Sequence, residues 1–476
     1  MKLTLRPLPG KRLSDQLREA GVEFPCGGEG VCGGCRVRVL EGEIPVTAPM
    51  RALLGEGELR EGWRLACMAS AAGPVTVEVE QWSARVLTDE AGSAVEPRRG
   101  WGVAIDLGTT TLVAQLVNLE TGEIEAVETA LNAQVRFGAD VMSRIQHELR
   151  QPGELTRVIR QQIGAMLGRL SAGRRLAEVL LAGNTAMHHL FCGLDVSPLA
   201  SVPFLSPHTG AQRLGPDRVP WRAPTLFLPC LGGFVGSDLL AGVIATRLDR
   251  SPGRQALFDI GTNGEIVVAW RKGLRCASTA AGPAFEGGRI RHGMRACEGA
   301  IDAVQIEDGR LSIHVIGGGE PRGICGSGLV DAAARALELG LLLPNGRLVE
   351  NPLPLAGSVA LTQSDVRQLQ LAKGAMAAGL KMIAREASRL RLAGAFGNYL
   401  RLGSARRIGL LPEDVEVEPA GNAALRGTRM LLLEPSSRQQ RIERILAMTE
   451  HVELAADPRF EEIFAESMRL APYRLR

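Results

Sequence analysis

The sequence predicts two folded parts of different class: a small α+β domain at the N-terminus and a larger α/β domain built from two similar halves. Strand-like alternation of apolar residues runs through the first eighty residues and fades over 81–100, where Ala91-Gly-Ser-Ala-Val-Glu-Pro-Arg-Arg-Gly100 is typical of a linker. Beyond the linker, a strand–turn–strand pattern occurs twice, which indicates a duplication. We therefore expect domains at 1–80 and 101–476, joined by a linker at 81–100.

Short strands and a helix are expected in the first eighty residues. Residues 2–8, 36–40 and 75–79 alternate apolar and polar side chains, as strands with one buried face do. Ser14 is a suitable N-cap for a helix that Gly21 ends. These elements predict a compact α+β unit.

The second part contains the internal repeat. An apolar strand leads into Asp106-Leu-Gly-Thr-Thr110, and a second strand follows. The pattern returns 153 residues later, where Asp259-Ile-Gly-Thr-Asn-Gly264 again lies between two apolar strands. Helical patterns follow the two copies at 141–149 and 364–390. Two such copies predict a two-lobed α/β domain with a cleft between its halves.

Composition excludes several classes of function. The net charge is only +3 and no basic face or tail stands out, so neither nucleic acid nor a lipid surface is expected as a partner. No apolar run reaches the roughly 18 residues of a membrane span, and the first residues lack the apolar core of a signal peptide. We therefore expect a cytoplasmic protein, in which thiols stay reduced.

Four of the nine cysteines crowd the first 67 residues, with the spacing Cys26-x5-Cys32-x2-Cys35-x31-Cys67. Three cysteines on one short loop and a fourth from a distant segment match the plant-type [2Fe–2S] arrangement, with the first gap one residue longer. The five glycines of the loop let its backbone N–H groups approach the cluster sulfurs. A four-cysteine zinc site is one alternative, although it more often shows two CxxC pairs. Four unrelated buried thiols are the other. The remaining five cysteines lack ligand spacing and are expected in the core.

The Asp-x-Gly-Thr turns are suited to phosphate. Gly108 lets the backbone approach an anion, and Thr109 and Thr110 offer hydroxyl donors. Asp106 is an acceptor only, so it would orient Mg²⁺ or the attacking water. The corresponding candidates in the second copy, with the glutamate that follows, are Asp259, Gly261, Thr262, Asn263, Gly264 and Glu265.

Further glycine-rich segments are candidates for the same cleft. The segment 280–288 contributes Gly282 and Glu286 as cleft candidates. Gly326, Ser327 and Gly328 stand at the start of an expected helix, which suits an anion or a nucleotide edge. Close helix–strand packing is the alternative for these glycines and for the turn at Gly394 and Gly397, which follows an expected buried strand. The segment Leu180-Leu-Ala-Gly-Asn-Thr-Ala-Met-His-His189 passes from strand to helix, and its histidines are as well explained as a satisfied helical pair.

The combination of an iron–sulfur domain, a linker and a duplicated phosphate-hairpin domain resembles the reductive activators of corrinoid-dependent enzymes. The resemblance covers nearly the whole chain. It rests on the four cysteines and on the segments 106–110, 259–265, 280–287, 324–328 and 421–425.

The resemblance implies an α+β β-grasp ferredoxin-like N-terminal domain. It also implies an α/β two-lobed duplicated ATPase domain of the acetate and sugar kinase/Hsp70/actin (ASKHA) class. Members often carry an additional domain between these two parts, whereas here only a linker fits. By the resemblance, Gly326, Ser327, Gly328, Gly394 and Gly397 would contact the adenosine of ATP.

The activity that the resemblance implies is ATP-dependent transfer of one electron from the [2Fe–2S] cluster to the inactive Co(II) state of a corrinoid protein, which restores Co(I). The implied cofactors are the cluster, ATP and Mg²⁺. The implied partners are the corrinoid protein of a methyltransferase system and an upstream low-potential electron donor. A homodimer stays open.

Two other functions use the same residues. A small-molecule kinase could carry the cluster as a regulator, with the hairpins transferring phosphate to a metabolite. An ATP-gated module could bind a metalloprotein and keep the cluster as a structural element.

Overall fold

The structure is a computed structural model of the chain. It describes all residues except 1, 7–12, 14–15, 18–35, 55–58, 80–94, 139–140, 202–203, 205, 252–253, 262, 272 and 476. The chain divides into two compact units. The first contains Met1–Cys230 and Thr428–Gln439, and the second contains Leu231–Gly427 and Gln440–Arg476.

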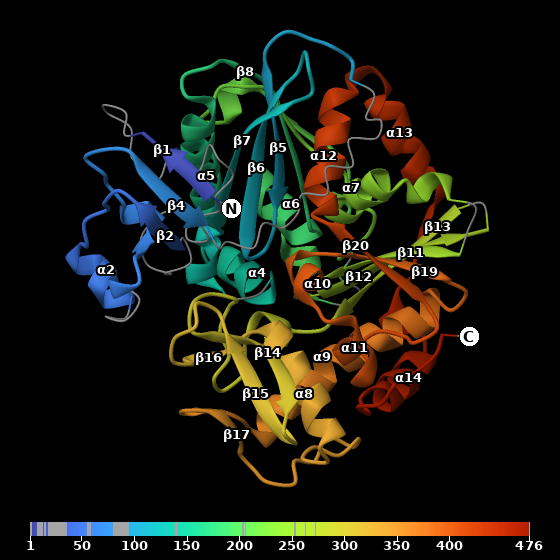
Figure 1. Ribbon diagram of the computed structural model, residues 1–476. Helices are drawn as coiled ribbons and strands as arrows, with labels where there is room; N and C mark the ends of the chain where they lie inside the picture. Colours follow the sequence, from blue (N-terminus) through green and yellow to red (C-terminus); the bar gives the residue numbers. More distant parts are fainter. Residues whose placement is uncertain are drawn as a thin grey trace. The chain divides into compact units, whose positions relative to one another are not determined.

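A four-stranded antiparallel sheet forms the N-terminal part of the first unit, with the strand order β1-β4-β2-β3 (Figure 1). The alternation in sequence gives it one buried face, where Val37 and Val77 pack with Met50 of a short helix. The strands expected at 36–40 and 75–79 are confirmed, and most of the helix expected after Ser14 lies outside the described residues. The elements are β1 (Lys2–Leu5), β2 (Arg36–Glu41), α2 (Ala48–Leu53), β3 (Trp63–Leu65), η1 (Ala66–Met68) and β4 (Val75–Val79).

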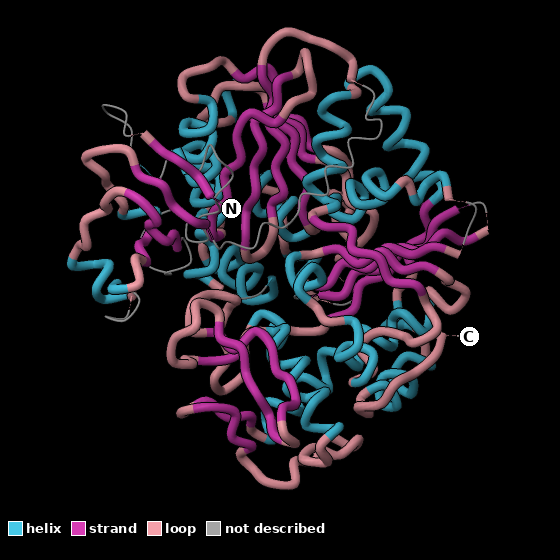
Figure 2. The backbone as a smooth tube through the Cα atoms, in the orientation of Figure 1, coloured by secondary structure: helices cyan, strands magenta, loops and turns pink. Residues whose placement is uncertain are grey.

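A six-stranded mixed sheet, β7-β6-β5-β8-β10-β9, forms the rest of the first unit (Figure 2). β5 and β6 make an antiparallel hairpin, and β8 lies parallel to β5 on the other side. Near-continuous apolar runs explain why β5 and β8 are buried central strands. The strands are β5 (Trp101–Leu107), β6 (Thr111–Asn118), β7 (Ile124–Leu131), β8 (Leu176–Gly183), β9 (Gln212–Leu214) and β10 (Thr225–Phe227), and the helices are η2 (Ala133–Phe137), α4 (Val141–Arg150), α5 (Glu154–Ser171), α6 (Thr185–Cys192), η3 (Ser197–Leu199) and η4 (Pro216–Arg218).

The main sheet of the second unit has the order β20-β19-β11-β12-β13-β21. Again a hairpin, β11–β12, is followed by an antiparallel third strand, and two parallel strands lie on the other side of β11. The order β13-β12-β11-β19-β20 therefore repeats β7-β6-β5-β8-β10, with the same strand directions. The duplication predicted from the two Asp-x-Gly-Thr segments is confirmed within each unit.

Helices and two small sheets complete the second unit. The strands are β11 (Gln255–Ile260), β12 (Asn263–Trp270), β13 (Gly273–Ala280), β14 (Ala300–Glu307), β15 (Arg310–Val315), β16 (Gly323–Ile324), β17 (Leu353–Ala356), β18 (Val359–Leu361), β19 (Arg389–Ala393), β20 (Glu416–Gly421) and β21 (Thr449–His451). The helices are α7 (Ser237–Thr246), η5 (Leu248–Arg250), η6 (Pro283–Glu286), α8 (Gly326–Glu338), α9 (Gln363–Ile383), α10 (Ala395–Tyr399), α11 (Leu402–Arg407), α12 (Ala423–Leu433), which continues into the first unit, α13 (Pro435–Met448), which returns from it, η7 (Leu454–Ala456) and α14 (Arg459–Ser467).

The helix expected over 364–390 is wrong at its C-terminal end. α9 begins with a capping box between Thr362 and Asp365 and ends at Ile383, and β19 begins at Arg389. The overrun covers residues 384–390, where a turn at 385–386 and the first two residues of β19 replace the expected helix. The buried strand expected before Gly394 is confirmed as β19.

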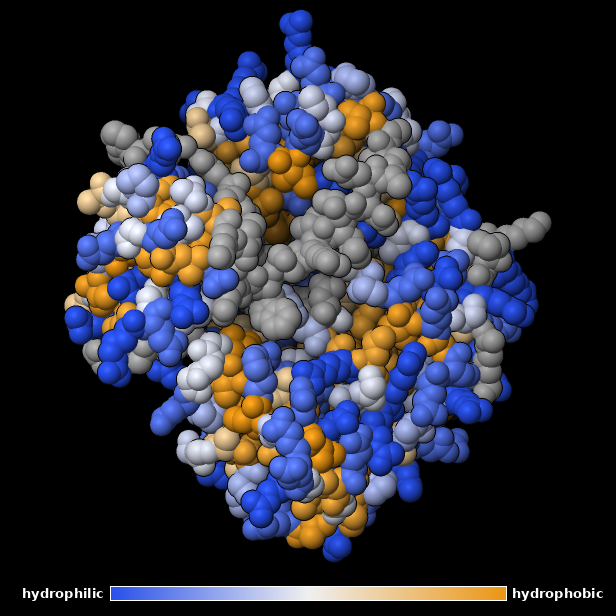
Figure 3. Space-filling model, in the orientation of Figure 1, coloured by the Kyte–Doolittle hydropathy of each residue, from blue (hydrophilic) through white to orange (hydrophobic). Residues whose placement is uncertain are grey.

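In the described part of the chain, no helix is long and apolar enough to cross a membrane. Figure 3 shows hydrophilic residues interspersed with hydrophobic ones over the face that it draws.

One charged side chain in the core of the second unit links stability to pH. Lys373 of α9 is 1% exposed, and its Nζ donates to the carbonyl oxygens of Arg469 at 2.6 Å and Gly409 at 3.4 Å. Burial, with a smaller effect from the charge of Lys381, lowers the pKa of Lys373 to about 7.

We predict that the free energy of unfolding rises with pH above about 7. Between that pH and the usual lysine pKa near 10.4, the unfolded chain binds more protons at Lys373 than the folded chain, which adds a slope of at most about 1.4 kcal/mol per pH unit. Urea unfolding between pH 7 and 8.5 measures this slope. Lys373→Met should flatten it, and equal slopes in both proteins would contradict the assignment.

Candidate functional site

The first phosphate-type turn is the tip of the β5–β6 hairpin. Leu107 pairs with Leu112, and the backbone N–H of Gly108 donates to the carbonyl oxygen of Thr111 at 3.1 Å. A Cβ at Gly108 would lie 2.5 Å from that oxygen, so the turn requires glycine. Asn132 supports the turn from outside, because its Nδ2 donates to the Gly108 carbonyl at 2.9 Å. Asp106, half-buried, is the last residue but one of β5.

The end of β8 lies directly beside this hairpin. Leu107 pairs with Gly183, and a Cβ on Gly183 would come within 2.5 Å of the Leu107 carbonyl oxygen. The next residue, Asn184, caps α6 by accepting from the backbone N–H of Met187 at 2.9 Å. Its Nδ2 donates to Oγ1 of Thr109 at 2.7 Å. Asn184 therefore contacts the phosphate-type turn. The Gly-Asn-Thr passage from strand to helix was noted in the sequence as a source of polar groups for a site, without a role for Asn184 itself.

The histidines that follow are structural. His188 and His189 are fully buried, and His189 bonds the Thr185 carbonyl and Ser206 Oγ through its two ring nitrogens. His188 Nε2 lies 3.1 Å from the Gly210 carbonyl oxygen. Burial, and then the neighbouring His189, lowers the pKa of His188 to about 3. This confirms the reading of a buried helical pair.

The second phosphate-type turn is the tip of the β11–β12 hairpin. Ile260 pairs with Gly264, and the Gly261 N–H donates to the Asn263 carbonyl oxygen at 3.0 Å. Thr262 lies outside the described residues. Gly394, at the end of the parallel strand β19, takes the place that Gly183 has in the first unit. Its φ is +88°, and a Cβ there would lie 2.6 Å from both the Ile260 carbonyl oxygen and Oδ1 of Asp259.

Carboxylates gather behind the second turn. Asp259 and Glu265 are directly opposite each other on β11 and β12, and Glu265 is only 8% exposed. Burial, and then the charges of Asp238 and Asp259, raise the pKa of Glu265 well above its usual value, against a hydrogen bond with Asn263. Burial and the two neighbouring carboxylates therefore both disfavour the ionised form of Glu265.

Asp238 is a site candidate that the sequence analysis missed. It lies in the first turn of α7, where its Oδ1 accepts from the Leu239 N–H at 2.8 Å. The signal was weak: a Gly-Ser-Asp start of a helix, without a strand before it.

The other glycine-rich segments meet within the second unit. The rings of Phe285 in η6 and Phe396 in α10 stack with centroids 4.8 Å apart, and a Cβ on Gly326 would contact both residues. A Cβ on Gly328 would clash with the Ile301 carbonyl oxygen of β14. Close packing thus accounts for Gly326 and Gly328, and the first turn of α8 is buried.

The remaining candidates differ in their surroundings. Ser327 is buried, and its Oγ lies 3.2 Å from Cys325 Sγ. Gly397 packs against Leu392: a Cβ on Gly397 would lie 3.0 Å from Cγ of Leu392. Gly282 has φ +79° and open space at its Cβ position, which suits close approach of a ligand. Glu286, half-buried, ends η6.

Of the four proposed cluster ligands, the structure describes Cys67, a half-buried residue of η1 that packs against the domain core. Cys26, Cys32 and Cys35 lie outside the described residues, and within the described ones no three Cys, His, Asp or Glu side chains are arranged to hold a metal. The pairing of β2 with β3 is consistent with Cys35 and Cys67 as ligands of one cluster. Arg36, which follows Cys35, pairs with Leu65, two residues before Cys67.

The other cysteines are core residues, as expected. Cys192, Cys230, Cys276 and Cys325 are buried and Cys297 is half-buried. Burial raises the pKa of Cys276 to about 12, so its thiol stays protonated.

Three family models match the chain. A 2Fe-2S iron-sulfur cluster binding domain matches residues 2–72, which contain all four proposed ligands. The RACo middle region matches 101–251, and the C-terminal domain of RACo, the ASKHA domain, matches 254–475. The region named "middle" therefore coincides with residues that we assigned to the first half of the ATPase domain, directly after the linker. The predicted ferredoxin-like and ASKHA domains are confirmed, and the first match supports a [2Fe–2S] cluster.

Individual relatives agree with these models. The corrinoid activation enzyme RamQ of Eubacterium limosum is 33% identical over 415 residues, which cover 76% of this chain and 69% of that protein. A [Co(II) methylated amine-specific corrinoid protein] reductase of Methanosarcina barkeri is 27% identical, covering 76% of each chain. The solved structure of a reductive activator for a corrinoid, iron–sulfur protein shares the fold, with a TM-score of 0.70, 24% identity and coverage of 98% of this chain and 97% of that one. The chain therefore belongs to the family of corrinoid activation enzymes, reductive activators that join a [2Fe–2S] ferredoxin-like domain to an ASKHA domain.

Proposed function

We propose that this protein transfers one electron to the inactive Co(II) state of a corrinoid protein of a methyltransferase system and so restores Co(I), in a reaction that requires ATP. The observation that carries the proposal is the pairing, in one chain, of a ferredoxin ligand set with two glycine turns built for phosphate. We assign residues 1–80 to the ferredoxin-like domain, 81–100 to the linker and 101–476 to the ATPase domain, and we place the protein in the cytoplasm.

The ligands of the [2Fe–2S] cluster in this proposal are Cys26, Cys32, Cys35 and Cys67. When bound, the cluster supplies a single electron at low potential, which an upstream low-potential donor replaces. The pairing of Arg36 with Leu65 supports the set, because it brings the two chain segments that carry Cys35 and Cys67 together. Arg38, held by a 3.1 Å bond from Nε to the Glu61 carbonyl, adds positive charge to the same strand.

ATP binding is assigned to the two hairpins. In the first unit, the turn at Gly108 to Thr110 contacts phosphate, and Asn184 holds Thr109 in place for that contact. Asp106 in the first unit and Asp259 in the second are each suited to Mg²⁺ or its water ligands, since carboxylates are its usual protein ligands. In the second unit, the raised pKa of Glu265 reduces the negative charge beside Asp259, which favours an anionic ligand. Gly282, with open space at its Cβ position, and Glu286 complete the proposed site.

An energetic argument explains why ATP is needed. Co(I) corrinoids are stronger reductants than plant-type clusters, which lie near about −400 mV, and each 100 mV of gap costs about 2.3 kcal/mol per electron. ATP offsets this cost only if its binding or hydrolysis favours one state of the complex over another. We infer that this state is one in which a ligand to Co(II) is displaced.

We predict that the reduced protein converts a Co(II) corrinoid protein to Co(I) only when Mg-ATP is present. The measurement is the cobalt absorption spectrum of an anaerobic mixture, with and without nucleotide. Equal reduction without ATP would refute the coupling, and absence of Co(I) in both mixtures would refute the activity.

We predict that Cys67→Ser abolishes or strongly alters the [2Fe–2S] electron paramagnetic resonance signal of the reduced protein and stops Co(I) formation. Cys297→Ser is the matched control, since Cys297 is also half-buried but lacks ligand spacing. The control should keep the signal. A Cys67→Ser protein with an unchanged spectrum would remove Cys67 from the ligand set.

We predict that Gly394→Ala weakens ATP binding at least about tenfold, because its Cβ would push against the Ile260 carbonyl and the Asp259 carboxylate. Gly309→Ala is the control: Gly309 lies in the turn between β14 and β15, has φ +72° and has open space around its Cβ position. Gly394→Ala also strains the backbone more than the control does, because φ +88° with ψ 153° is a conformation that is essentially restricted to glycine. Titration of each protein with a fluorescent ATP analogue gives the two dissociation constants, and equal values would contradict the assignment.

A further inference from the structure

The first unit contains a cavity of about 350 Å³ that is separate from the phosphate-type turn. Its lining includes Arg98, Glu178, Arg213, Pro224 and Arg438. Arg98 precedes β5, Glu178 is in the first half of β8, and Pro224 directly precedes β10. Because these strands are parallel, the cavity lies at their amino ends, whereas the turn at Gly108 lies at the carboxyl ends. Along β8 the two edges are separated by about 16 Å, the rise of five residues.

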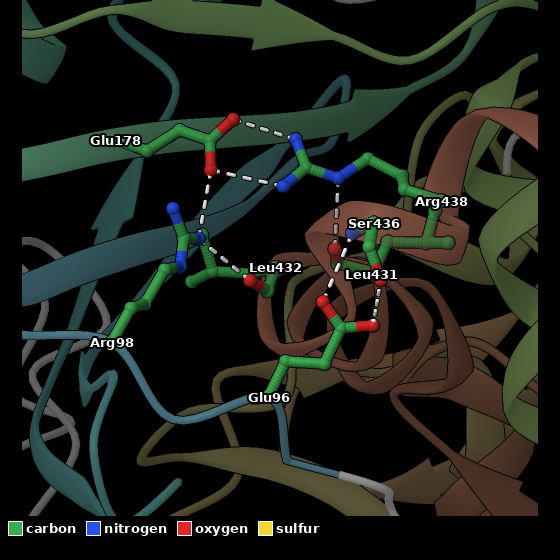
Figure 4. A network of polar contacts seen from close by, with 7 residues as sticks. All are labelled: Glu96, Arg98, Glu178, Leu431, Leu432, Ser436 and Arg438. Atoms are coloured by element: carbon green, nitrogen blue, oxygen red, sulfur yellow. Dashed lines mark hydrogen bonds and ion pairs between the residues drawn. The ribbon is translucent and has the colours of Figure 1, made fainter.

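A single carboxylate holds two of the guanidinium groups in the cavity wall (Figure 4). Arg438 binds Glu178 through both terminal nitrogens, at 2.6 and 2.9 Å, and donates from Nε to the Leu431 carbonyl at 2.9 Å. Arg98 Nη2 donates to the same carboxylate and to the Leu432 carbonyl, each at 2.8 Å. The side chain of Arg438 is 7% exposed and that of Glu178 is 15% exposed, so these groups are fixed in position.

The charge of this wall is not balanced. Three guanidinium groups line the cavity with one carboxylate, and both oxygens of that carboxylate are already bonded. Burial raises the pKa of Glu178, but the hydrogen bonds and charges of Arg438 and Arg98 outweigh it and hold the pKa below its usual value. Glu178 therefore stays ionised, which leaves a net charge of +2 among the lining side chains.

One donor in the wall also lacks a partner. Nε of Arg98 is buried and makes no hydrogen bond. A buried donor without an acceptor costs about 1–3 kcal/mol. The unpaired positive charge itself is in contact with solvent, since Arg213 is exposed and the side chain of Arg98 is 30% exposed. The nearby carboxylate of Glu96 does not supply the balance, because it accepts from the backbone N–H and hydroxyl of Ser436 at the start of α13.

We propose that this cavity is an anion site that binds a phosphoryl group through Arg98, Arg213 and Arg438. The fork of Arg438 is used on Glu178 and its Nε on Leu431, so Arg438 contributes fixed positive charge. Arg213, exposed on β9, contributes a guanidinium fork that matches the spacing of phosphate oxygens. The cavity is larger than a phosphate ion, so the group can be free phosphate or the phosphate of a small ester. Since Arg98 is at the end of the linker and Arg438 is in α13, a bound phosphoryl group ties these two segments together. The inference does not depend on the proposed corrinoid activity.

The test is thermal unfolding of the full chain, nucleotide-free, titrated with inorganic phosphate at constant ionic strength. Arg213→Ala is the informative variant, because Arg213 is exposed on β9 and its loss leaves the Glu178 network intact. Arg157→Ala, which removes an exposed arginine of α5 away from the cavity, is the matched control. Gly394→Ala is included because it alters the proposed nucleotide site alone.

We expect a saturable rise in Tm for the unmodified chain, Arg157→Ala and Gly394→Ala, and an apparent Kd at least tenfold weaker for Arg213→Ala. Glycerol 3-phosphate in a parallel titration distinguishes the two sources, since tighter binding than phosphate identifies an ester as the ligand. An equal response of Arg213→Ala and the unmodified chain, or a rise that sodium chloride reproduces, would overturn the proposal.

Discussion

The candidate sites depend on a steric constraint found in both units: where a parallel strand ends against the hairpin, the residue at or directly after its end has no side chain. Gly183 and Gly394 meet this constraint, because a Cβ on either would lie 2.5 or 2.6 Å from a carbonyl oxygen of the adjacent turn. The contact brings the carboxyl ends of two parallel strands together. Sheets of this kind place ligands at that edge. In the first unit the same contact places Asn184 within reach of Thr109.

The elements and their order could largely be predicted from the sequence, because each rests on a local pattern. The two hairpins, the strands before them and the strand-to-helix passage at 180–189 all follow from apolar runs broken by glycine. The boundary of α9 could not, since the five residues between α9 and β19 contain neither glycine nor proline. The end of that helix depends on the pairing of β19 with β11, which is a tertiary effect.

The site could be predicted only where its residues share one motif. Asp238 is absent from the predicted set because it lies on another element than Glu265. Its charge raises the pKa of Glu265, and no sequence motif contains both residues. The arginine cluster is the stronger case. Its four charged residues are too far apart in the chain for any spacing rule: Arg98, Glu178, Arg213 and Arg438. They come together only because the six-stranded sheet orders β5, β8 and β9 and the start of α13 lies beside them. The two ends of the parallel strands in the six-stranded sheet of the first unit therefore differ: glycine turns lie at the carboxyl ends and paired charges at the amino ends.

The course of the chain through α12 and α13 has a consequence for biosynthesis. The first unit is completed by Thr428–Gln439, which the ribosome makes only after all of Leu231–Gly427. Until then Glu178 has no Arg438 and Glu96 has no Ser436, so the linker end is held only by Arg98, through its bonds to Glu178 and Leu119. Domains commonly fold in order from the N-terminus during synthesis. Here the four-stranded sheet can form early, whereas the part of the first unit that contains the six-stranded sheet is complete only after nearly the whole polypeptide has been made. In a nascent or prematurely terminated chain, that part of the first unit stays incomplete.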